Sequence, residues 1–173
     1  MIIKDFIRTV PDFPKKGIMF RDISPLLQNP KASSYCVSEF VDKLYERKID
    51  YVIGIDSRGF IFGPQIAQSM GIGFVMARKT GKLPPSYLEQ YYDLEYGQSS
   101  LCIPEGLKIG SSVHIHDDVL ATGGTIEAVI KMVISADMIV DSISCIIELD
   151  ELHGRRMLME RYNVSEIISL IKY

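Results

Sequence analysis

Residues 113–125 read Val-His-Ile-His-Asp-Asp-Val-Leu-Ala-Thr-Gly-Gly-Thr, and this stretch indicates both the fold and the ligand. A β-type run leads to two adjacent carboxylates, Asp117 and Asp118. A loop of small residues follows, made of Ala121, Thr122, Gly123, Gly124 and Thr125. A helical pattern begins directly after it, and the junction of a strand with a helix is a ready anion site, where paired glycines let the main chain approach a phosphate. An acid pair suited to sugar hydroxyls, followed by a phosphate loop, predicts a site for ribose 5-phosphate.

Each part of this stretch also has an ordinary explanation. An Asp-Asp pair can belong to a turn or a cap, and Thr-Gly-Gly-Thr can be a flexible loop. The ordered combination of strand, acid pair, small-residue loop and helix is more specific than either part. The sequence has neither G-x-x-x-x-G-K-[ST] nor a G-x-G-x-x-G after a strand, which disfavours a P-loop NTPase and a dinucleotide-binding fold.

Strand-like and helix-like segments alternate along most of the chain. Asn29 and Pro30 suit the cap and the first position of a helix. Strands are expected at 51–55, 73–77, 112–116, 140–148 and 166–172, and further helices at 60–70, 125–136 and 154–161. This alternation predicts an α/β fold with a mainly parallel sheet flanked by helices. Ligands bind beyond the carboxyl ends of such strands, so 56–59, 78–82 and 117–125 should surround one crevice.

The composition fits one globular domain spanning residues 1–173. A hydrophobic content of 47% argues against disorder, and a net charge of −3 gives no reason to expect nucleic acid or an anionic membrane as a partner. No apolar run approaches the roughly 20 residues of a bilayer-spanning helix, and no signal peptide is recognised, so we expect a cytoplasmic protein. The cysteines lack metal-ligand spacing and are expected as reduced thiols: Cys36, Cys102 and Cys145.

The 113–125 stretch resembles the phosphoribosyl-diphosphate-binding motif of the type I phosphoribosyltransferases. Four further segments narrow the resemblance to the adenine-using members of that family. They are Pro-Asp-Phe-Pro at 11–14 with Phe-Arg-Asp-Ile-Ser-Pro at 20–25, Asp-Ser-Arg-Gly-Phe-Ile-Phe-Gly-Pro at 56–64, Arg-Lys-Thr-Gly-Lys-Leu-Pro at 78–84, and Tyr-Asp-Leu-Glu-Tyr-Gly at 92–97. They occur in the order and spacing of the family and extend over nearly the whole chain.

The resemblance implies a glycosyltransferase of purine salvage. Such an enzyme transfers the 5-phosphoribosyl group from phosphoribosyl diphosphate to N9 of adenine, giving AMP and pyrophosphate. Mg²⁺ would be carried by the diphosphate rather than by dedicated protein ligands, and a homodimer is expected. Two alternatives share the sugar-phosphate features: a phosphoribosyltransferase for another purine such as xanthine, and a non-catalytic regulator that senses phosphoribosyl diphosphate. Such regulators carry a DNA-binding domain, and no basic helical module precedes the first core strand.

By the same resemblance, the loop at 121–125 would hold the 5-phosphate. Asp117 and Asp118 would bind the ribose hydroxyls, and their charge would favour an oxocarbenium-like transition state. Ser57 and Arg58 would receive pyrophosphate beside a cis, non-proline peptide bond that the family has at this place. A helix-start loop with a surface arginine is the ordinary explanation for these two residues.

Residues 78–97, here called the lid segment, are long and polar and lack a clear core face, which is typical of a flexible lid loop. Its closure would exclude water from the reacting sugar. Three basic residues would contact pyrophosphate unless they form only a solvated turn: Arg78, Lys79 and Lys82. Glu95 matches the general acid proposed for the family near N7 of the base, and Tyr96 is expected at the substrate. A glutamate on a surface strand is the alternative.

Residues 1–28, here called the hood, fit the alternation poorly because prolines and a glycine interrupt regular elements. Their apolar residues indicate that the segment packs on something, and the resemblance places it over the base. Phe20 is the candidate to stack on adenine, while Met19 and Arg21 offer backbone or side-chain contacts. A phenylalanine that only packs is the other explanation.

Two features depart from the family pattern. His114 and His116 stand where valine-like residues are usual, and strand alternation places both on one face. A zinc site would need a third ligand, which is not nearby in the sequence, so a hydrogen-bonded, half-buried pair is expected. Ser-Ala-Asp-Met at 135–138 replaces the usual glycine-containing exit from the preceding helix.

Overall fold

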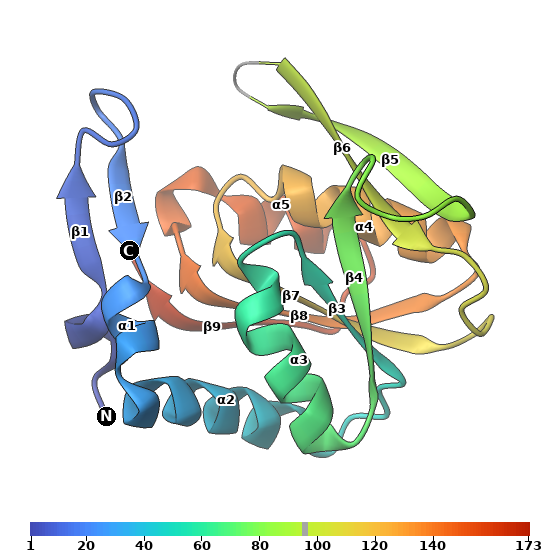
Figure 1. Ribbon diagram of the computed structural model, residues 1–173, viewed down its shortest axis with the longest axis horizontal. Helices are drawn as coiled ribbons and strands as arrows, with labels where there is room; N and C mark the ends of the chain where they lie inside the picture. The colour runs from blue at the N-terminus through green and yellow to red at the C-terminus, as the bar shows by residue number, and fades with distance from the viewer. Residues whose placement is uncertain (95–96) are drawn as a thin grey trace.

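The structure is a computed structural model that describes residues 1–94 and 97–173. Its centre is a seven-stranded sheet in the order β5-β6-β4-β3-β7-β8-β9 (Figure 1). Five neighbouring strands are parallel to one another: β4, β3, β7, β8 and β9. Strands β5 and β6 form an antiparallel hairpin at the β4 edge of this group. Their bounds are β3 Tyr51–Ile55, β4 Gly73–Lys79, β5 Tyr87–Leu94, β6 Gly97–Pro104, β7 Ser112–Leu120, β8 Ile139–Glu148 and β9 Glu166–Lys172. The predicted α/β fold with a mainly parallel sheet is confirmed.

Helices cover both faces of the sheet because its central strands are apolar on both sides. Ile53 packs in the core formed with α4 and α5, whereas Val52 packs in the core formed with α2 and α3. The helices are α2 Pro30–Leu44, α3 Gly59–Met70, α4 Gly124–Ser135 and α5 Gly154–Arg161. Helix α2 begins as predicted, since the Asn29 side chain accepts hydrogen bonds from two backbone N–H groups at 3.1 Å. Among the described residues, none of the helices has the length and apolar character needed to span a membrane.

Strand β7 is longer than the predicted strand at 112–116. It pairs with β3 only as far as His116, but it pairs with β8 to its last residue, Leu120. Asp117 and Asp118 therefore stand inside the strand and beyond its last pair with β3, rather than after the strand as expected. The backbone hydrogen bonds to β8 alone are enough to keep this end of β7 extended.

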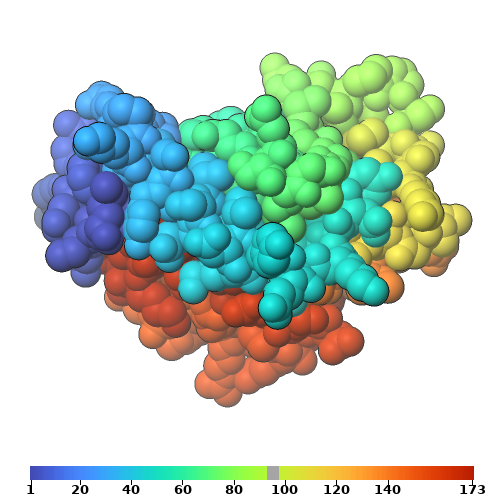
Figure 2. All heavy atoms as spheres, turned by 90° about the horizontal axis from the view of Figure 1, so that it is seen from below, coloured from blue at the N-terminus to red at the C-terminus, as the bar shows by residue number. Residues whose placement is uncertain are grey.

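The hood contains regular elements, although its prolines and glycine predicted none. It consists of a 3-10 turn at Ile3–Phe6, a hairpin of β1 Arg8–Pro11 and β2 Met19–Asp22, and the short helix α1 Ser24–Gln28. The breaking residues lie at the end of β1, in the hairpin turn and in the first turn of α1, so neither the ladder nor the helix is interrupted. Buried side chains at Ile3, Ile7, Ile23 and Leu26 attach the hood to the core with α2 and α3. Figure 2 shows this segment in blue beside the C-terminal strand in red.

The lid segment is also more regular than expected. Strand β4 continues to Lys79, and β5 and β6 pair from Tyr87 onward, forming the hairpin at the upper right of Figure 1. Leu88 and Tyr92 pack against the core, so β5 has a core face that its polar composition concealed. Strand β6 was not predicted, although its Leu101 is fully buried. Residues 87–94 are therefore not a loop as predicted, because antiparallel pairing with β6 supplies their order.

Candidate active site

The acid pair occupies the centre of the carboxyl edge of the sheet. Asp118 is buried, with 3% of its side chain exposed, and Asp117 is half-buried. The N–H of Asp118 donates a 2.8 Å hydrogen bond to Oδ1 of Asp117. Burial raises the pKa of both carboxyls, and the charge on Asp118 raises that of Asp117 further, whereas Arg58 opposes the increase. The pair is short of hydrogen-bond donors, which the hydroxyls of a sugar would supply.

The loop after β3 places Arg58 beside the acid pair. The peptide bond between Asp56 and Ser57 is cis, as the resemblance implies, and Ser57 is exposed. Nε of Arg58 lies 3.0 Å from Oδ2 of Asp118, yet within the described residues this buried oxygen accepts no hydrogen bond. The contact is therefore an ion pair without directed hydrogen bonding. A side chain at Gly59 would approach a carbonyl of β7 to 2.5 Å, so glycine allows α3 to begin this close to the acids.

The predicted phosphate loop surrounds a small cavity. Asp117, Val119, Leu120 and residues 121–126 line a space of about 70 Å³. Helix α4 begins within this lining at Gly124, and the first N–H groups of a helix have no partners inside it. Gly123 precedes it with φ of 88°, the left-handed conformation that glycine adopts without strain. The geometry is that of an anion site at a helix N-terminus.

A larger cavity of about 520 Å³ lies under the hood hairpin. Its lining combines apolar side chains with a few charged and polar ones: Arg8, Val10, Phe13, Phe20, Asp22, Ile23, Ser24, Leu27, Arg58 and Ile61. The rings of Phe13 and Phe20 meet edge to face, with centroids 5.2 Å apart. The guanidinium of Arg58 lies 5.7 Å from the Phe20 centroid. An apolar cavity with aromatic walls suits a flat heterocycle.

Strand alternation separates the three hood residues that were predicted to contact the base. Phe20 lines the larger cavity, whereas Met19 and Arg21 do not. Met19 is half exposed, and the guanidinium of Arg21 lies 3.7 Å from the centroid of the Tyr173 ring. Arg21 also donates a hydrogen bond to the hydroxyl of Thr9. The side chain of Arg21 therefore points away from the cavity.

The basic residues of the lid segment are only partly gathered at the crevice. Nε of Arg78 lies 3.3 Å from Oδ2 of Asp56, next to the pyrophosphate candidates, and its Nη1 donates to the carbonyl of Lys82 at 3.4 Å. The side chains of Lys79 and Lys82 are exposed. Two other candidates lie outside the described residues: Glu95 and Tyr96.

His114 and His116 form a buried hydrogen-bonded chain with two serines of β8. Nδ1 of His114 lies 2.8 Å from Oγ of Ser142, and the Oγ of Ser144 lies 2.7 Å from both His114 Nε2 and His116 Nδ1. The pair is hydrogen-bonded as predicted, although it is fully buried rather than half-buried. Burial lowers the pKa of both imidazoles to about 3, so both are neutral near pH 7. Across 1–94 and 97–173, no group of three His, Cys, Asp or Glu is placed to hold a metal ion.

Some contributors to the site were not foreseen. Leu27 and Ile61 line the larger cavity from α1 and α3, and no motif in the sequence marked either residue. Gly154 at the start of α5 contacts the phosphate loop from behind. The Gly-Arg pair at 154–155 was the one sequence feature that could have indicated this contact. The phosphate loop that Gly154 meets lies about thirty residues earlier in the chain, so the sequence alone does not connect the two.

Comparisons with known proteins agree with this geometry. A family model described as a phosphoribosyl transferase domain matches residues 26–172. An adenine phosphoribosyltransferase of Brachyspira hyodysenteriae is 46% identical over 97% of this chain and 99% of its own length. A crystal structure of the adenine phosphoribosyltransferase from Thermoanaerobacter pseudethanolicus is 47% identical with a TM-score of 0.92, covering 99% of this chain and 98% of that one. The Saccharomyces cerevisiae enzyme, in complex with an imino-altritol bisphosphate and adenine, is 36% identical with a TM-score of 0.90, covering 98% and 96%.

Proposed function

Since this chain belongs to the phosphoribosyl transferase family and, within it, to the adenine phosphoribosyltransferases, we propose that it makes AMP from adenine and phosphoribosyl diphosphate. In this reaction the bond from ribose C1 to the diphosphate oxygen breaks, and a bond from C1 to N9 of adenine forms. The products are AMP and pyrophosphate.

The observation that carries the proposal is the position of Arg58. Its side chain lines the larger cavity and pairs with Asp118. Asp117, the neighbour of Asp118, lines the small cavity of the phosphate loop. An aromatic cavity, an acid pair and an anion site thus follow one another in the order of base, ribose and phosphate in AMP.

The acid pair supplies the electrostatics of the reaction. As the bond to pyrophosphate breaks, positive charge develops on the ribose, and two nearby carboxylates stabilise it more than the neutral ground state. The pair binds the ribose hydroxyls, whose donated hydrogen bonds counter the burial that raises the pKa of Asp117 and Asp118. The loop at 121–125 anchors the 5-phosphate and so fixes the reacting carbon.

The leaving pyrophosphate is received by the loop at Ser57 and Arg58. Arg78 contributes from the end of β4, where Asp56 holds its guanidinium. Mg²⁺ carried by the diphosphate would offset its charge, and the carboxylates of the acid pair are oxygen groups of the kind that Mg²⁺ accepts. The lid segment, with Lys79 and Lys82, closes over this end and excludes water.

The hood holds the base. Phe20 stacks on adenine in the larger cavity, and main-chain groups of β2 around Met19 and Arg21 read its edge. Glu95 acts as the general acid near N7, and Tyr96 contacts the substrate; both assignments rest on the resemblance. A cytoplasmic homodimer completes the proposal.

The test is AMP formation from each purine base in the presence of Mg²⁺ and phosphoribosyl diphosphate. Adenine offers a 6-amino group and an unprotonated N1, whereas hypoxanthine, guanine and xanthine carry a 6-oxo group and a protonated N1. A site that hydrogen-bonds the adenine edge rejects the other bases by about 10⁴ or more in kcat/KM. Equal use of another base would overturn the adenine assignment, and binding of phosphoribosyl diphosphate without turnover would favour the regulator.

A further inference from the structure

The phosphate loop is supported from behind by the first turn of α5. A Cβ placed on Gly154 would lie 2.1 Å from the carbonyl oxygen of Ala121 and 3.0 Å from the nitrogen of Gly123. A Cβ on Gly123 would in turn lie 2.8 Å from Cε of Met157. Main chain meets main chain here, so a shift of α5 is transmitted directly to the loop. The opposite face of the loop lines the phosphate cavity.

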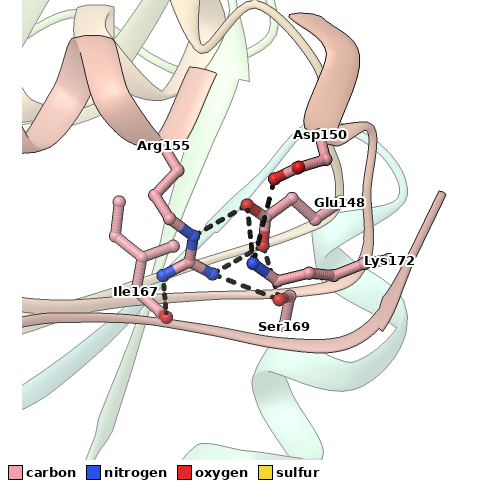
Figure 3. A network of polar contacts seen from close by, with 6 residues as sticks. All are labelled: Glu148, Asp150, Arg155, Ile167, Ser169 and Lys172. Atoms are coloured by element: carbon pink, nitrogen blue, oxygen red, sulfur yellow. Dashed lines mark hydrogen bonds and ion pairs between the residues drawn. The ribbon is translucent and has the colours of Figure 1, made fainter. Parts of the chain in front are cut away.

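The residue after Gly154 fixes the position of α5. Arg155 donates through Nε to Oε1 of Glu148 at 2.7 Å and through Nη2 to Oε2 at 2.5 Å, as Figure 3 shows. Its Nη1 donates to the carbonyl of Ile167 at 2.7 Å, and Ser169 donates to Oε2 of Glu148 at 2.6 Å. The guanidinium is therefore held on two strands at once, in the fork geometry that arginine makes with a carboxylate.

Glu148 stands at the right place to connect this pair with the loop. It is 1% exposed and is the last residue of β8, directly opposite Leu120, after which the phosphate loop begins. Burial alone raises the pKa of Glu148, but hydrogen bonds from Arg155 and Ser169 outweigh burial and lower the pKa to about 2. The carboxylate is thus charged throughout the physiological pH range and maintains its ion pair with Arg155.

We propose that Arg155 is a positioning residue for the 5-phosphate, which it serves by clamping the start of α5 against the back of the phosphate loop. The ion pair with Glu148 sets the distance between Gly154 and the loop backbone. The loop N–H groups then converge on the phosphate without rearrangement. The inference rests on the proposed function in taking the loop as the 5-phosphate site.

The experiment compares ligands that differ only in the phosphate. Calorimetric affinities for ribose 5-phosphate, AMP and adenosine are measured with the unmodified protein, Arg155→Met and Arg155→Lys. Hydrogen bonds to a charged phosphate weaken steeply when they are misaligned, so Arg155→Met should weaken ribose 5-phosphate and AMP by roughly 10- to 100-fold. Adenosine affinity should stay unchanged, and Arg155→Lys, which keeps the charge but loses the fork, should be intermediate.

The matched control is Arg156→Met, one position further along the same helix. Arg156 has 77% of its side chain exposed and pairs along the helix surface with Glu160, at 2.7 Å. This variant should bind all three ligands like the unmodified protein. Equal losses in both methionine variants would overturn the proposal, as would an equal loss of adenosine affinity in Arg155→Met.

Two further measurements distinguish a failure of the clamp from a failure of the variant to fold and from a failure of the proposed function. If Arg155→Met does not fold, Arg155→Lys and Ser169→Ala decide by the same comparison, and unchanged ribose 5-phosphate affinity in both overturns the clamp. Turnover of the unmodified protein tests the proposed function separately. If the variants lose affinity only for the phosphate-bearing ligands and the unmodified protein makes no AMP, the clamp is supported and the enzyme assignment is wrong. If the unmodified protein makes AMP and the variants lose affinity for adenosine as well, the enzyme assignment is supported and the clamp is wrong.

Discussion

The guanidinium of Arg21 lies over the ring of Tyr173, with its Cζ 3.7 Å from the ring centroid. The ammonium of Lys4 lies 4.3 Å from the same centroid. Tyr173 also hydrogen-bonds through its backbone to Glu148 and Asp150, both at 2.9 Å, so the ring is held beside the sheet. Because side chains alternate along β2, fixing Arg21 on this ring turns its neighbour Phe20 toward the base cavity.

Replacement of Tyr173 by alanine should therefore weaken adenine binding, although Tyr173 does not line the base cavity. Cation–π contacts are worth roughly 0.5–2 kcal/mol, so the KM for adenine should rise about two- to thirtyfold in Tyr173→Ala. Tyr173→Phe keeps the ring and should behave like the unmodified enzyme. Steady-state kinetics with each substrate varied in turn provide the measurement, and an equal rise in the KM for phosphoribosyl diphosphate would contradict the idea.

The acid pair should matter more for turnover than for product binding. Asp117→Asn and Asp118→Asn preserve shape but remove the charge that stabilises the cationic ribose, so each should raise the barrier by about 2–4 kcal/mol. The AMP Kd should change much less. Asp42→Asn, on the exposed face of α2, is the control. Normal kcat in both active-site variants would remove the acid pair from the mechanism.

The lid segment should become more protected when substrate binds. Hydrogen exchange of residues 80–92 is measured with and without Mg²⁺ and phosphoribosyl diphosphate. The side-chain hydroxyl of Thr80 contacts Glu89 and Ser100, both at 2.5 Å, so the turn is joined to the β5–β6 hairpin and should respond together with it. Strand β8 in the buried sheet serves as the reference and should exchange slowly in both states. Identical exchange of 80–92 in both states would mean that the segment does not act as a lid.

Asp137 should be a site where glycine stabilises the protein. It has φ of 54° after α4, and its N–H donates to the carbonyl of Ile134 while the N–H of Met138 donates to that of Val133, both at 3.0 Å. These bonds form a Schellman motif, whose left-handed position usually holds glycine. Asp137→Gly should add about 0.5–1 kcal/mol to the free energy of unfolding, and Asp137→Ala should lower it. Urea denaturation measures both, and the same sign for both variants would exclude backbone strain as the cause.

Local sequence patterns predicted the parallel core and the order of acid pair and phosphate loop, because both depend on neighbouring residues. They did not predict β6, whose order comes from pairing across a hairpin. The sequence patterns also predicted that Arg21 contacts the base. In the structure its side chain instead packs on Tyr173, which is distant in the sequence. The clamp of Arg155 on Glu148 was missed for the same reason, since neither residue shows in the sequence that it meets the other beside the phosphate loop.

The buried histidines should make the protein less stable as the pH falls. Burial lowers the folded-state pKa of His114 and His116 to about 3, whereas an unfolded histidine titrates near 6.5. Between these values the unfolded chain binds more protons than the folded one, so the free energy of unfolding rises with pH. This stability is complete above about pH 6.5 and is lost toward pH 3, with a slope of up to about 1.4 kcal/mol per pH unit for each histidine.

His116→Asn isolates this contribution, because an asparagine amide can replace Nδ1 in its 2.7 Å contact with Ser144 and does not titrate. Burial also raises the pKa of Asp117 and Asp118, but these carboxyls are the same in both proteins and their contributions cancel in the comparison. Urea unfolding between pH 6.5 and 4.5 should give a slope smaller by up to about 1.4 kcal/mol per pH unit in the variant. His153→Asn, at the exposed start of α5, is the matched substitution of a histidine outside the core. A variant His116→Asn with the slope of the unmodified protein would mean that this imidazole takes up its proton while still folded, which its closed environment between Phe40 and Phe62 opposes.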